Sequence, residues 1–302
     1  GWMADDGALF QALETTGPLG GMIMVHAESV FVLDMLVKRY YPQRHKVGAY
    51  GHALCRPNYT EYEAVSRAVQ WAEASGGKLY VVHISAGESA DILKAAQERG
   101  VRVYGETCPQ YLLLDESVFK GKDGHLYGTC PQIKKKKDSV RLWKALTDGE
   151  IAMISTDTCT FNKKQKAMWK GDFTKIPFGM PGVETMLPLT MHYGRKKGLS
   201  VNRIVELCCA NPAKLHGLYP EKGTLAIGAD ADIVVYDTNV KRKLDYRKLQ
   251  TNCDWSPFQG FDVQGWPAAT LSRGKVVALN GKFVGEKGWG RFVKRKPFGE
   301  LK

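Results

Sequence analysis

Two histidines and one aspartate occupy positions from which they could act on a substrate. His26 follows the apolar run 21–25, His83 follows the run 78–82, and Asp157 comes three residues after the run 150–154. Imidazole nitrogens and a carboxylate are ligands that suit zinc and similar divalent metals. A metal held there would acidify water and polarise a carbonyl, and the carboxylate could move a proton. The pattern favours a metal site, the alternative being structural histidines satisfied within the core.

The elements that would position these residues follow one pattern along the chain. Short apolar runs at 21–25, 78–82, 101–104 and 150–154 alternate with helical patterns such as 59–75 and 88–99. Runs of this length between helices are typical of buried parallel strands, so the sequence predicts an α/β fold, either barrel or doubly wound. In a barrel the carboxyl ends of the strands share one rim, which would gather His26, His83 and Asp157.

The pattern changes after about residue 223. A strand is predicted within 228–236 and another within 269–279, with a turn at Arg273-Gly274. Asn280-Gly281 then predicts a further hairpin turn. We therefore expect two domains, residues 1–222 with the α/β pattern and residues 223–302 as a small β domain.

Composition and charge narrow the classes of protein and partner. The 302 residues carry 43 Lys and Arg against 31 Asp and Glu, a formal charge of +12, and 44% are hydrophobic, as in ordinary globular proteins. The densest basic run, 134–137, lacks interleaved aromatic residues, so we predict a solvated loop and no nucleic-acid partner. No run of 18 apolar residues predicts a membrane span. Seven scattered cysteines without a CxxC pair favour reduced thiols and a cytoplasmic location.

Several segments carry a resemblance to a known family. Residues 25–28 (VHAE), 82–85 (VHIS) and 105–112 (GETCPQYL) resemble the hydantoinase/dihydropyrimidinase family of cyclic amidohydrolases. Further similar segments are 155–157, 172–177, 211–214, 228–233, 273–274 and 295–298, so the resemblance covers nearly the whole chain. It implies an amidohydrolase-type (β/α)₈ barrel with two divalent metals, expected to be zinc. It also implies a homotetramer that hydrolyses non-peptide C–N bonds in cyclic amides, opening hydantoin or dihydropyrimidine rings.

The resemblance also assigns roles to residues. It implies that His26 and His83 bind the more exposed metal, and that Asp157 binds the more buried one and acts as general base and then acid. Cys130 and Phe178 lie in segments whose family counterparts touch substrate through backbone atoms, so they are candidate substrate contacts. Phe178 stands where the family has asparagine and is expected to reshape the pocket. The alternative for both is an ordinary loop residue.

Two parts of the family's metal centre have no counterpart in this sequence. The family has a His-x-His pair on its first barrel strand and a carboxylated lysine on the fourth that bridges the metals. No His-x-His occurs in the chain, and no lysine precedes His26. The four predicted strands match strands five to eight, so we expect about half of the barrel, the C-terminal part of the β domain, and a fragment inactive on its own. The alternative is a non-catalytic dihydropyrimidinase-related assembly or binding protein, against which the presence of His26, His83 and Asp157 argues.

Overall fold

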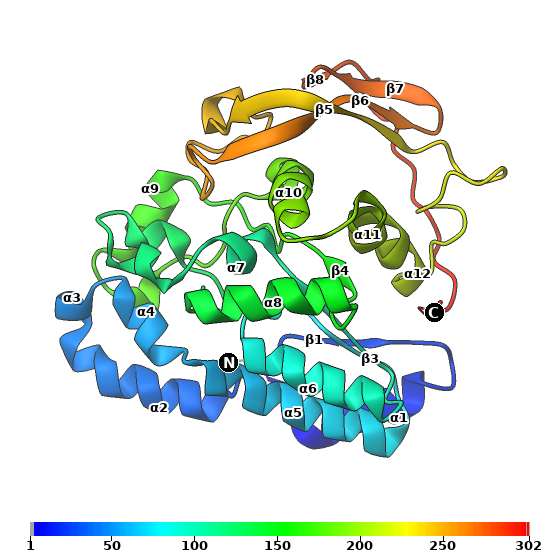
Figure 1. The fold of residues 1–302 in the computed structure, drawn as a ribbon. Helices are drawn as coiled ribbons and strands as arrows, with labels where there is room; N and C mark the ends of the chain where they lie inside the picture. Colours follow the sequence, from blue (N-terminus) through cyan, green and yellow to red (C-terminus); the bar gives the residue numbers. More distant parts are fainter. Residues whose placement is uncertain (1–2, 300, 302) are drawn as a thin grey trace. The chain divides into compact units, whose positions relative to one another are not determined.

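The computed structural model describes residues 3–299 and 301 (Figure 1). The chain forms two compact units, one ending at Gly182 and the other beginning at Val183. The predicted domains, 1–222 and 223–302, divide the chain later, where helical patterns give way to strand patterns. The helices after residue 183 belong with the second unit because helix α10 (Val183–Leu189) packs on its strand β6 (Asp262–Ser272).

The first unit contains a parallel sheet of four strands. They are β1 (Ile23–Val25), β2 (Leu79–Val81), β3 (Val103–Thr107) and β4 (Met153–Ile154), hydrogen-bonded in that order. Strands β1, β2 and β4 lie within the predicted apolar runs, whereas β3 begins within the run 101–104 and continues to Thr107. Strand β2 is buried along its whole length. This confirms the predicted α/β fold with a parallel sheet, since strands covered on both faces are apolar throughout.

A row of helices covers this sheet. They are α1 (Asp6–Thr16), α5 (Asn58–Ser75), α6 (Gly87–Glu98) and α8 (Lys136–Asp148), and each packs on the next in that order (Figure 1). The order matches that of the strands, as right-handed strand–helix–strand crossovers require. Helix α5 ends at Ser75, and the next residue, Gly76, has φ +65°, the left-handed conformation that glycine adopts readily.

Shorter helices build the loops that follow the strands. They are α2 (Val30–Tyr40), α3 (Arg44–Val47), α4 (Tyr50–Cys55), α7 (Pro109–Leu113) and α9 (Lys163–Lys166). Single 3₁₀ turns lie at 41–43, 116–120, 124–127, 167–169 and 173–175. Leu36, Cys55, Phe173 and Ile176 belong to one buried cluster, with Phe178 packed against it, so the loop at 173–178 is anchored on α2 and α4.

The second unit combines helices with an antiparallel sheet. Its helices are α10, α11 (Val201–Val205) and α12 (Asn211–Leu215), with π-helical turns at 190–194 and 206–210. Its strands β5 (Ile233–Lys243), β6, β7 (Lys275–Leu279) and β8 (Lys282–Phe283) pair in sequence order, and a 3₁₀ turn lies at 246–248. Both predicted hairpin turns are present. Arg273-Gly274 and Asn280-Gly281 have positive φ at both residues, as type I′ turns require.

None of the helices that the structure describes is long and apolar enough to cross a membrane. All seven cysteines are free thiols.

Candidate metal centre

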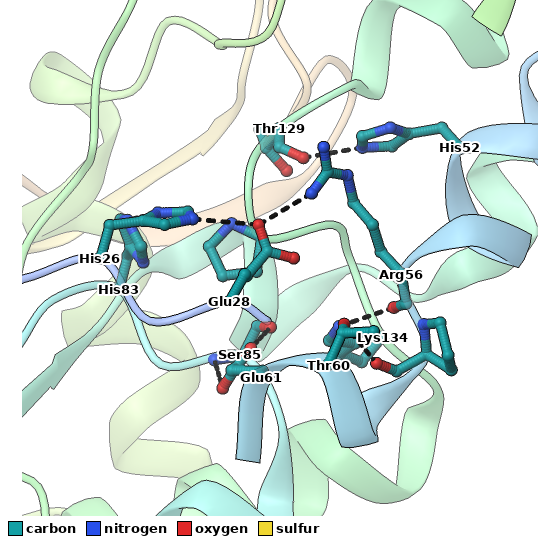
Figure 2. A network of polar contacts seen from close by, with 12 residues as sticks. His26, Glu28, His52, Arg56, Thr60, Glu61, His83, Ser85, Thr129 and Lys134 are labelled. Atoms are coloured by element: carbon teal, nitrogen blue, oxygen red, sulfur yellow. Dashed lines mark hydrogen bonds and ion pairs between the residues drawn. The ribbon is translucent and has the colours of Figure 1, made fainter. Parts of the chain in front are cut away.

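The first unit brings His26 and His83 into contact at the ends of neighbouring strands. Strand β1 pairs with β2 so that Val25 lies opposite Val81, and each histidine follows shortly after. His26 Nδ1 lies 3.0 Å from His83 Nε2, and the ring centroids are 4.8 Å apart in an edge-to-face arrangement (Figure 2). Two histidines that are 57 positions apart in the sequence thus have ring nitrogens that face one another.

This separation is close to that of two ligands of a single metal ion. Two histidine nitrogens at zinc–nitrogen distances of about 2.0–2.1 Å in tetrahedral geometry lie about 3.3 Å apart. The pair therefore fits two positions of a zinc shell. Among residues 3–299 and 301, no group of three or more His, Cys, Asp or Glu side chains could hold a metal ion. The described residues thus fit part of a coordination shell and do not complete one.

Asp157 lies beyond the end of β4, outside any such three-donor group. It is exposed as a residue, but partial burial of its carboxyl and the negative charge of Glu106 raise its pKa to about 6, against a smaller opposing effect of His26. The residue is thus electrostatically coupled to the histidine site.

Backbone strain marks two of the three predicted residues. Among the described residues, five that are not glycine have positive φ. Arg273 and Asn280 sit in hairpin turns, and Lys170 ends the helical turn 167–169. His83 (φ +41°) and Asp157 (φ +48°) instead follow strands, with no turn type or helix cap that requires the conformation. Strain of this kind collects at functional sites, where surrounding contacts hold it.

The turn after His83 is held by a buried carboxylate. Glu61 on α5 accepts the backbone N–H groups of Ser85 (3.1 Å) and Ala86 (2.9 Å). It also accepts the hydroxyl of Ser85 (Figure 2) and that of Ser89 (2.8 Å). Because Ser85 and Ala86 directly precede helix α6 (Gly87–Glu98) and Ser89 lies in its first turn, the carboxylate also faces the positive end of that helix. The backbone that carries His83 is therefore fixed from α5.

A second buried carboxylate, which the sequence analysis missed, contacts His26. Glu28 Oε2 accepts a hydrogen bond from His26 Nε2 (3.0 Å) and one from Arg56 Nη1 (2.8 Å). Burial by itself would raise the Glu28 pKa, but the hydrogen bond from His26 and the charges of Arg56 and Lys134 outweigh it and lower the pKa to about 2. The spacing His26-x-Glu28 could have indicated this contact, since alternate residues of an extended segment face the same side.

Lys134 corrects the prediction for the basic run. The run 134–137 was expected to be a solvated loop, but Lys134 is 3% exposed, and although residues 135–137 are exposed, Lys136 and Lys137 already belong to helix α8. Its Nζ donates to the backbone oxygen of Arg56 (2.8 Å), beside the amide of Gln132 (3.1 Å). The prediction was wrong because a carbonyl at the end of helix α4 and nearby carboxylates, including Glu28, compensate the buried charge.

The two candidate substrate contacts border Arg56. Cys130 and Glu28 line the same hollow as Arg56. The Arg56 guanidinium also lies over the Phe178 ring, 5.4 Å from its centroid. The Phe178 ring packs against His52 at 4.7 Å, and His52 Nε2 donates to the Thr129 oxygen (2.7 Å). The loops that carry Cys130 and Phe178 are thus connected through contacts with Arg56 and His52, and Cys130 lines the same hollow as His26.

Comparisons with known proteins agree with this architecture. The amidohydrolase family model matches residues 44–277. The chain is 40% identical to a D-hydantoinase of Geobacillus stearothermophilus over 99% of this chain and 64% of that protein. It is 39% identical to a D-phenylhydantoinase of Escherichia coli over 97% and 64%. Crystal structures of a D-hydantoinase from Bacillus sp. AR9 and a dihydropyrimidinase from Brevibacillus agri each match at 40% identity with a TM-score of 0.96, over 99% of this chain and 66% of theirs.

The α/β fold and the match to the amidohydrolase family model identify an enzyme family whose members are typically metal-dependent. The chain belongs to the amidohydrolase family, within its hydantoinase/dihydropyrimidinase branch, which confirms the resemblance seen in the sequence. It spans about 64% of the length of the curated relatives it matches.

Proposed function

We propose that this chain carries part of the active site of a metal-dependent cyclic amidohydrolase that opens hydantoin or dihydropyrimidine rings. The observation that supports this most directly is the 3.0 Å contact between His26 Nδ1 and His83 Nε2, which is close to the separation of about 3.3 Å between two nitrogen ligands of one zinc ion. Relatives at 40% identity named for hydantoin and dihydropyrimidine hydrolysis support the substrate class. The four parallel strands would be strands five to eight of a (β/α)₈ barrel.

His26 and His83 would hold one divalent metal, expected to be zinc. Bound zinc would supply an acidified water and polarise the carbonyl that is attacked. Asp157 would take a proton from the attacking water and deliver it to the ring nitrogen as the C–N bond breaks. Cys130 and Phe178 would border the ring, with Phe178 limiting the space beside it.

The remaining ligands would come from polypeptide outside the described residues. By the resemblance these are a His-x-His pair and a carboxylated lysine, and the complete enzyme would be a homotetramer. We therefore expect the 302-residue chain alone to bind zinc weakly at the histidine pair and to open no ring.

Zinc binding and ring opening test these two statements separately. Zinc affinity would be measured by calorimetry for the unmodified chain, for a His26→Ala/His83→Ala variant, and for His45→Ala, a matched change at an exposed histidine on α3. Weak binding that the double variant loses and His45→Ala keeps would support the site. Equal affinity in all three proteins would contradict it. Hydantoin and dihydrouracil hydrolysis by the unmodified chain would refute its incompleteness while supporting the substrate class.

A further inference from the structure

We propose that Glu28 is a positioning residue for His26. In this proposal the carboxylate accepts the Nε2–H of His26, which leaves Nδ1 unprotonated and directed at His83. The inference rests on the proposed function, because it explains how His26 is prepared to bind a metal through a particular nitrogen.

The distances assign the proton on the His26 ring. An ionised carboxylate can only accept, so the 3.0 Å contact with Glu28 Oε2 requires the hydrogen to be on His26 Nε2. A neutral imidazole carries one N–H, so Nδ1, on the other side of the ring, keeps its lone pair. That lone pair faces His83 Nε2 at 3.0 Å. Histidine ligands of metals commonly donate their second N–H to a carboxylate in this way, which fixes tautomer and ring orientation.

Arg56 fixes the carboxylate itself. Its Nη1 donates to Glu28 Oε2 at 2.8 Å, the same oxygen that faces His26, and the Glu28 side chain is 2% exposed. The backbone oxygen of Arg56 in turn accepts from Lys134 Nζ and Gln132 Nε2. Contacts therefore run from the loop before helix α8 through Arg56 and Glu28 to His26 (Figure 2). Two nitrogen groups, Arg56 Nη1 and His26 Nε2, thus lie within hydrogen-bond distance of the same carboxylate oxygen.

A purely structural role for Glu28 makes a different prediction from a positioning role. If Glu28 served only to pair with Arg56, then Glu28→Met and Arg56→Met would both destabilise the fold and neither would act selectively on His26. If Glu28 sets the tautomer, Glu28→Met releases the His26 ring, whereas Arg56→Met weakens the fold and leaves the acceptor beside Nε2. Arg56→Met is therefore the matched control.

The tautomer can be read directly by long-range ¹H–¹⁵N correlation spectra of histidine-labelled protein at pH 8, without metal. The signals of His26 are identified by their loss in His26→Gln. We expect the Nε2–H form in the unmodified chain and in Arg56→Met, and a mixture of tautomers or the Nδ1–H form in Glu28→Met. An Nδ1–H form in the unmodified chain would overturn the proposal, whether or not the variants fold.

Zinc affinity gives a second test. We expect Glu28→Met to bind zinc about 10-fold to 100-fold more weakly than the unmodified chain, as for other outer partners of histidine ligands. Unchanged affinity and an unchanged His26 tautomer in folded Glu28→Met would also overturn the proposal. Because the tautomer is measured without metal or substrate, equal zinc affinity in the unmodified chain and the His26→Ala/His83→Ala variant would count against the proposed function alone.

Discussion

Glu61→Ala is expected to destabilise the first unit by about 4 kcal/mol. The carboxylate is 2% exposed and accepts four hydrogen bonds, two of them from the backbone N–H groups of Ser85 and Ala86, which are themselves buried. Each buried donor left without a partner costs about 1–3 kcal/mol. The two serine hydroxyls can rotate toward other acceptors, so the backbone groups account for most of the effect.

Two further variants test whether these hydrogen bonds are the cause. Glu61→Gln can keep an oxygen at the Oε1 position, which accepts both backbone N–H groups and the Ser89 hydroxyl, so we expect a loss of only about 1 kcal/mol. Glu63→Ala, on the exposed side of the same helix, breaks only a surface pair with Arg67 and should cost less than about 0.5 kcal/mol. Urea unfolding followed by circular dichroism gives the three values. Equal losses for Glu61→Ala and Glu61→Gln, or a Glu61→Ala loss below about 1 kcal/mol, would refute the reasoning.

Three other expectations concern buried groups near the site. Burial and the charge of Arg56 lower the His52 pKa to about 3, so unfolded His52 binds a proton below about pH 6.5 while the folded residue does not. Stability should therefore fall as pH drops through that window, by about 2 kcal/mol from this residue at pH 5, and His52→Gln should reduce the difference between urea midpoints at pH 7.5 and pH 5. Lys134→Met should cost about 2 kcal/mol because it removes a buried donor to the Arg56 carbonyl, whereas Lys135→Met at an exposed position should change stability by less than about 0.5 kcal/mol in the same assay. Phe178→Ala should cost about 2 kcal/mol by thermal or urea unfolding, since the ring packs on His52 and Arg56 while only half-buried; no measurable loss would remove its packing role.

The strands could be predicted where local pattern and packing agree. Strand β2 is an apolar run that is buried along its whole length, and the two hairpin turns contain residue pairs that tolerate positive φ. The first half of β6 was missed because Gly265 and Pro267 interrupt it. Gly265 has φ +96°, and the Tyr236 ring occupies the space where a Cβ would lie. A close approach between two strands therefore looks, in the sequence, like a strand break.

The candidate site was predictable only in its reactive side chains. His26 and His83 could be found because each follows an apolar run, and the parallel sheet then places the run ends together. The groups that hold them come from elsewhere: Arg56 is 28 residues from Glu28, and Lys134 is 78 residues from Arg56. Ion pairs and carbonyl contacts at such separations have no periodicity, so the sequence alone does not reveal them.

The two histidines are held in place in different ways, so removing Glu28 and removing Glu61 should have different effects. His26 is oriented through its own ring, by the hydrogen bond from Nε2 to Glu28. Loss of that contact therefore first changes which ring nitrogen carries the proton and how the ring is oriented. His83 is oriented through its backbone, at φ +41°, in a turn that Glu61 holds by the two residues following Ile84. Loss of Glu61 therefore acts first on the free energy of unfolding and reaches the imidazole only through relaxation of the strained turn. Binding of a metal that needs both ring nitrogens, which lie 3.0 Å from one another, would be weakened by either change. Only the Glu28 change would alter which ring nitrogen is protonated while the fold stays intact.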